Sequence, residues 1–64
     1  MSLTNDEVEE LEQILARAGD GMDQLNDWER GFINDQQKRF DQYGADIRLS
    51  PKQWAALRKI NEVL

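Results

Sequence analysis

Hydrophobic residues recur at helical spacing in three separate segments of the chain. In the first, about residues 5–18, the apolar positions fall on one arc of about 120° around a helix. These positions are Val8, Leu11, Ile14, Leu15, Ala18 and Met22. Thr4 and Glu7 have the spacing of a capping box, which predicts the start of this helix. We expect the helix to end at Gly19-Asp20-Gly21, because glycine accepts the backbone conformation of helix C-termini.

The second segment, about residues 27–43, carries most of the aromatic side chains. Asn26 and Glu29 form a second potential capping box, and Gly44 is the expected stop. One broad face of this helix holds Leu25, Trp28, Phe32, Ile33, Phe40 and Tyr43, with Gln36 and Arg39 as polar members. Since tryptophan is enriched both in cores and at interfaces, two readings remain open for Trp28 and Trp54. We favour core positions for both.

The third segment, about residues 51–64, begins at Ser50-Pro51, a strong signal for a helix start. Its apolar stripe contains Trp54, Leu57, Ile60 and Leu64. Together the three segments predict an all-α fold, with residues 1–64 as one small three-helix domain. We expect the second and third helices to form a hairpin around the loop 44–49, and the first helix to pack across it.

Composition restricts the chemistry that the chain can perform. The 64 residues include no cysteine and no histidine, so the usual thiol nucleophile and imidazole base are missing. We therefore expect no enzyme, no metal site and no cofactor. No apolar run approaches the roughly 18 residues of a membrane span, and the first residues do not resemble a signal peptide. The expected compartment is the cytoplasm, which is the host cytoplasm if the gene belongs to a phage.

The formal charge of −5 is unevenly distributed along the chain. Residues 1–27 contain eight acidic residues against one arginine, a charge of −7, and residues 28–64 contain five acidic against seven basic residues, a charge of +2. Two alternatives follow: the acidic and basic parts neutralise each other by docking, or they face different partners. In the second case the acidic first helix is a candidate mimic of DNA.

One short resemblance points to nucleic acid. The string LSPKQWAALRKI resembles the first helix of the DNA-binding region of sigma factors and LuxR-type regulators. In those families a recognition helix follows, whereas this chain stops at Leu64, so we do not expect direct nucleic-acid binding. The alternative is weak phosphate contact through the basic residues Arg48, Lys52, Arg58 and Lys59.

A second resemblance covers about residues 25–61. It rests on Leu25, Trp28, Glu29, Phe32, Ile33, Arg39, Tyr43, Gly44, Leu49, Ser50, Lys52, Gln53, Leu57 and Ile60. This pattern resembles a helical hairpin found in short, mostly uncharacterised proteins of bacteriophages and bacteria. The resemblance implies a phage or prophage origin and assigns no activity.

The remaining signals favour a protein-binding module. Gly31 lies inside the second helix, where glycine costs about 0.5–1 kcal/mol relative to alanine. With Asn34, Asp35 and Lys38 it forms a polar ridge at helical spacing, which a partner helix can approach closely. The alternative is a tolerated imperfection. The function we expect is that of a phage-type accessory protein that modulates a host or phage enzyme.

The small size of the chain also favours self-association. Three short helices cover one another's apolar stripes only partly, and no disulfide or metal is available to stabilise them. We therefore expect a homodimer, with the contact made by the first helix's stripe or by the aromatic face of the second helix.

Overall fold

Reciprocal side-chain hydrogen bonds define the start of each helix. Thr4 with Glu7 and Asn26 with Glu29 form the two predicted capping boxes, with N···O distances of 2.8–3.2 Å. At the third helix the Ser50 hydroxyl accepts from the N–H of Gln53, and the Gln53 side chain accepts from the N–H of Ser50. Each box satisfies N–H groups that have no partner within the helix.

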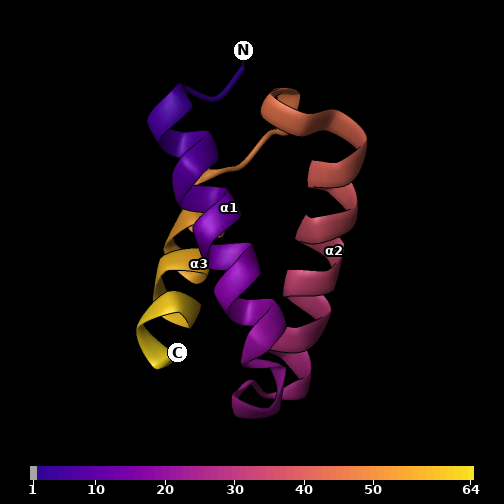
Figure 1. Ribbon diagram of the computed structural model, residues 1–64, viewed down its shortest axis with the longest axis vertical. Coiled ribbons are helices and arrows are strands. Elements are labelled where there is room, and N and C mark those ends of the chain that lie inside the picture. Colours follow the sequence, from indigo (N-terminus) through magenta and orange to yellow (C-terminus); the bar gives the residue numbers. More distant parts are fainter. Residues whose placement is uncertain (1) are drawn as a thin grey trace.

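The computed structural model describes residues 2–64, which form three α-helices and two short 3₁₀ turns (Figure 1). The elements are α1 (Asn5–Asp20), η1 (Met22–Gln24), α2 (Asp27–Tyr43), η2 (Gly44–Asp46) and α3 (Pro51–Val63). These residues contain no strand, which confirms the predicted all-α three-helix domain. Within residues 2–64 no helix has the length and apolar character needed to cross a membrane.

α1 and α2 each end at a glycine C-cap, and the end of α1 differs from the prediction. α1 continues through Gly19 to Asp20, and Gly21 is its C-cap, so the predicted end at residue 18 was two residues early. α2 ends at Tyr43, and Gly44 is its C-cap, as predicted. Gly44 has φ +56° and ψ −131°, a conformation open almost only to glycine. The chain can therefore turn directly from α2 into η2.

The three helices alternate in direction along the long axis of the molecule (Figure 1). α1 and α3 run the same way, and α2 runs opposite to both. α1 packs most extensively on α3 and less on α2. α2 and α3 run in opposite directions on either side of the loop 44–50, as a hairpin requires, but the more extensive pairing is that of α1 with α3. η2 and the extended residues after it carry the chain from α2 over to α1.

The core consists of one cluster of buried apolar side chains from all three helices and the loops. Its members are Leu11, Ile14, Leu15, Ala18, Leu25, Ile33, Ile47, Trp54, Leu57 and Ile60. Most of the predicted α1 and α3 stripes are here. Truncating the fully buried Leu57 to alanine is expected to cost about 2–5 kcal/mol, a large part of the stability of so small a domain.

α2 contributes a polar side chain to the core. Gln36 is 1% exposed, and its Oε1 atom has no hydrogen-bond partner within residues 2–64. Its neighbour one turn away on the same face, Ile33, is buried among apolar side chains. Burying this unpaired oxygen atom lowers the free energy of unfolding of the domain.

Candidate functional site

The predicted polar ridge lies on the outer face of α2. Gly31, Asn34, Asp35 and Lys38 are all exposed, at spacings that bring them to one side of the helix. Apart from its chain neighbours and the backbone of α2 itself, a Cβ atom on Gly31 would meet no atom within 4 Å. The fold itself therefore has no steric need for glycine at this position.

Beside the ridge, two aromatic rings form an exposed stack. Trp28 and Phe32 are one helical turn apart, with ring centroids separated by 5.3 Å and an angle of 7° between the planes. Trp28 is 64% exposed, whereas Phe32 is half-buried against the core. The prediction that both tryptophans lie in the core was right for Trp54 and wrong for Trp28. Trp28 lies at the edge of the predicted face, where no core residue lies over it.

The same side of α2 continues to its C-terminal end. Trp28, Phe32, Arg39 and Tyr43 fall within about 60° around the helix axis. We call these four residues the α2 flank. Tyr43 is 52% exposed and Arg39 is half-buried. The α2 flank therefore has two aromatic rings at its start and a cation followed by a phenol at its end.

A shallow groove lies at the C-terminal end of the α2 flank. It has a volume of about 260 Å³ and is lined by Arg39, Tyr43, Asp46 and Arg48. Asp46 accepts a hydrogen bond from the Ser2 hydroxyl at 2.6 Å, and the carbonyl of Ala45 accepts one from the N–H of Leu3 at 2.7 Å. The N-terminal segment is thus tied to η2, which carries one wall of the groove.

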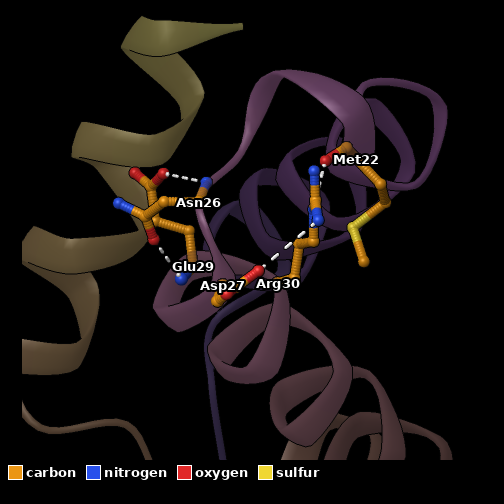
Figure 2. A network of polar contacts seen from close by, with 5 residues as sticks. All are labelled: Met22, Asn26, Asp27, Glu29 and Arg30. Atoms are coloured by element: carbon orange, nitrogen blue, oxygen red, sulfur yellow. Dashed lines mark hydrogen bonds and ion pairs between the residues drawn. The ribbon is translucent and has the colours of Figure 1, made fainter.

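The first turn of α2 is held in place by a local polar network (Figure 2). Beside the capping box of Asn26 and Glu29, Arg30 donates from Nε to the carbonyl of Met22 at 2.8 Å. Arg30 also lies 3.6 Å from the carboxylate of Asp27. Figure 2 shows the contact of Arg30 with Met22 joining η1 to the start of α2. They fix the turn from which Trp28 projects.

The four predicted phosphate-contacting residues do not gather into one cluster. Arg58 faces α1 and donates two hydrogen bonds to Glu10, at 2.8 and 3.3 Å. Lys52 and Lys59 are exposed together on another side of α3, and Arg48 belongs to the groove. Of the two alternatives for the uneven charge, internal docking is therefore realised at the Glu10–Arg58 pair.

The contact between Glu10 and Arg58 shifts the pKa of both side chains. Hydrogen bonds from Arg58 hold the pKa of Glu10 below its ordinary value of 4.5, against a smaller opposing effect of burial. The same contact raises the pKa of Arg58. The Arg58 guanidinium also lies 5.2 Å from the centroid of the Trp54 ring, a cation–π distance. Arg58 therefore has structural partners on two sides.

The outer face of α1 is acidic and exposed. Asp6, Glu9 and Glu12 point to solvent, while Leu11, Ile14, Leu15 and Ala18 are buried in the core. The stripe of α1 is thus not free for a dimer contact, contrary to one of the two predicted options. In residues 2–64, no group of three or more Asp, Glu, His or Cys residues is placed to hold a metal ion.

Sequence reasoning missed part of the site. It singled out the ridge but assigned Trp28 and Tyr43 to the core face, and it did not connect Arg39 with Arg48. The spacing of residues 28, 32, 39 and 43 carries the signal for the α2 flank, but the groove depends on where η2 brings residues 46 and 48. Comparison of the chain with protein-family models, curated proteins and solved structures gave no match.

Proposed function

We propose that this chain is a non-enzymatic protein-binding module whose contact surface is the α2 flank together with the neighbouring ridge. The observation that carries the proposal is Trp28, a large aromatic side chain that is 64% exposed in a chain of only 64 residues. Tryptophan is among the residues that contribute most to binding energy at protein interfaces.

The stack of Trp28 on Phe32 supports this proposal. The near-parallel contact at 5.3 Å holds the indole ring in one position before any partner arrives. A side chain that is already ordered loses less conformational entropy when it becomes buried in an interface. The contacts of Arg30 also reduce this loss of entropy, because they fix the turn that carries Trp28.

The ridge adds a second feature that a partner can use. Gly31 is exposed, lies next to the aromatic stack and has open space around it. A helix or strand of another chain can approach the backbone of α2 more closely at glycine than at any other residue. Because residues 25–61 resemble a helical hairpin of short phage and bacterial proteins, we propose that the partner is a host or phage enzyme, which the chain modulates.

The experiment is affinity capture with the full chain in three forms: the wild type, Trp28→Ala and Lys59→Ala. Lys59 is exposed on α3, away from the α2 flank, and serves as the matched control. We expect the wild type and Lys59→Ala to retain the same specific proteins, and Trp28→Ala to lose them while keeping the wild-type circular dichroism spectrum. Equal retention by all three forms would contradict the proposal.

A further inference from the structure

Two features at opposite ends of the α2 flank have complementary chemistry. At its start Trp28 projects into solvent, and at its end lies the groove lined by Arg39, Tyr43, Asp46 and Arg48. Positions 28 and 43 are separated by about 22 Å along a helix. Within one molecule they cannot meet.

We propose that the α2 flank binds a second copy of this chain, with the two α2 helices antiparallel about a twofold axis. In this arrangement Trp28 of each copy enters the groove of the other. The inference rests on the proposed function, because it takes the same α2 flank as the contact surface and adds a second copy of the chain as an occupant. A twofold contact is closed, so each interaction occurs twice and no further copies are added.

The register follows from the spacing of the α2 flank. When Trp28 lies opposite Tyr43 of the second copy, Phe32 lies opposite its Arg39. Both pairings place an aromatic ring of one copy at the end of the other copy's α2 flank, where Arg39 and Tyr43 lie. Guanidinium groups attract the faces of aromatic rings, most strongly those of tryptophan. The chain already contains one such contact, between Arg58 and Trp54.

Charge selects the antiparallel orientation. α2 begins with Asp27 and Glu29 against Arg30, which lies 3.6 Å from Asp27, and it ends with Lys38 and Arg39 against Asp41. Arg48, which follows η2, adds a second cation to the groove at the end of α2. A parallel pair would set the cationic helix ends against each other. An antiparallel pair sets each cationic end against the acidic start of the other helix, and it brings the two Asp35 side chains close together near the twofold axis. Asp46 is the one acid in the groove, and it accepts a hydrogen bond from Ser2. The groove therefore keeps an excess of positive charge.

The available area indicates a weak dimer. Stable interfaces bury about 800 Å² on each partner, which is close to a fifth of the 4468 Å² exposed by this chain. One flank of a single helix supplies less than that. We therefore expect a Kd between about 10 µM and about 1 mM.

Sedimentation equilibrium tests the proposal with the wild type, Trp28→Ala, Arg39→Glu and the control Lys59→Glu. We expect the wild type and Lys59→Glu to shift from 7.5 kDa toward twice that mass over the same concentration range. Trp28→Ala and Arg39→Glu should raise the Kd at least about tenfold. Circular dichroism of each variant checks that the helices are retained.

Crosslinking tests the register separately. The chain contains no cysteine, so a single introduced cysteine is a unique site. Asp35→Cys lies close to the proposed twofold axis and should form a covalent dimer with a short bismaleimide, whereas Lys59→Cys should not. A failure of Asp35→Cys to crosslink at concentrations where the wild type is dimeric would overturn the antiparallel register.

Two results would overturn the second copy as the partner. One is a wild-type chain that stays monomeric up to about 1 mM, and the other is a dimer that Trp28→Ala and Arg39→Glu leave unchanged. A monomeric chain that still captures a different protein through Trp28 would leave the proposed function standing. If Trp28→Ala leaves binding to every other chain unchanged, both the second copy as partner and the proposed function are overturned.

Discussion

Arg58 donates two hydrogen bonds to the carboxylate of Glu10, from Nε at 2.8 Å and from Nη2 at 3.3 Å. The contact joins α3 to α1 across the most extensive helix pairing in the fold. Because Arg58 also lies over the ring of Trp54, the pair covers one edge of the core. The ionisation of Glu10 therefore affects the stability of the folded domain.

Replacing Glu10 by glutamine should lower the melting temperature at neutral pH. The folded state holds the pKa of Glu10 below 4.5, so its contribution is present above that value and is lost as the pH falls through the lowered pKa. The difference between wild type and Glu10→Gln should therefore shrink on acidification. Thermal unfolding followed by circular dichroism at pH values above and below 4.5 measures it.

Glu9→Gln is the matched control, since Glu9 is exposed on α1 and has no ion pair within residues 2–64. It should change the melting temperature little at either pH. A Glu10→Gln effect of the same size at neutral and acidic pH would contradict the account of this pair.

Gly31→Ala should stabilise the fold by about 0.5–1 kcal/mol, because alanine has the higher helix propensity and the new methyl group meets no atom beyond its own stretch of helix within 4 Å. Gly19→Ala is the matched control, since Gly19 is also helical and also has open space around it. Chemical denaturation should show a similar gain for both variants.

The two variants should differ in binding. If a partner approaches the backbone at Gly31, Gly31→Ala weakens capture of that partner while Gly19→Ala does not. Equal binding by both variants would show that the glycine in α2 is only a tolerated imperfection.

Gln36→Leu should stabilise the chain by about 1–2 kcal/mol. The substitution removes a buried Oε1 atom that lacks a hydrogen-bond partner and places an apolar side chain of similar size in the core. Gln42→Leu, at an exposed position on the same helix, should stay within about 0.5 kcal/mol of wild type. A loss of stability in Gln36→Leu would mean that the amide has an unrecognised partner.

The helix starts and the end of α2 could be predicted from the sequence because they depend on residues close together in the chain. Thr4 with Glu7 and Asn26 with Glu29 form their capping boxes within one turn, and Gly44 supplies a conformation that few other residues adopt. The apolar stripes of α1 and α3 were predictable for the same reason, since their spacing alone selects the buried face.

Features that depend on how the helices meet could not be predicted. Trp28 shares a broad apolar face with Ile33, but only the packing shows that Ile33 is covered and Trp28 is 64% exposed. The pairing of α1 with α3 depends on the path of the chain after η2. The groove likewise joins Arg39 to Arg48 through a turn whose direction no local pattern indicates.

Nucleic acid should bind weakly or not at all. Arg58 is hydrogen-bonded to Glu10, and the chain as a whole carries a charge of −5. Fluorescence anisotropy with single-stranded and duplex DNA and RNA at physiological salt measures this directly. Sub-micromolar binding that Lys52→Glu weakens would favour a nucleic-acid function over the protein-binding module.

If Trp28 lies at a contact with another protein chain, the N–H signal of its indole ring reports that contact. NMR of ¹⁵N-labelled protein follows the two indole N–H signals along a concentration series and after addition of captured partner. Trp54 is buried and serves as the internal reference. We predict that the Trp28 signal shifts in at least one series while the Trp54 signal stays. A Trp28 signal that stays unchanged in both series would contradict the contact at Trp28.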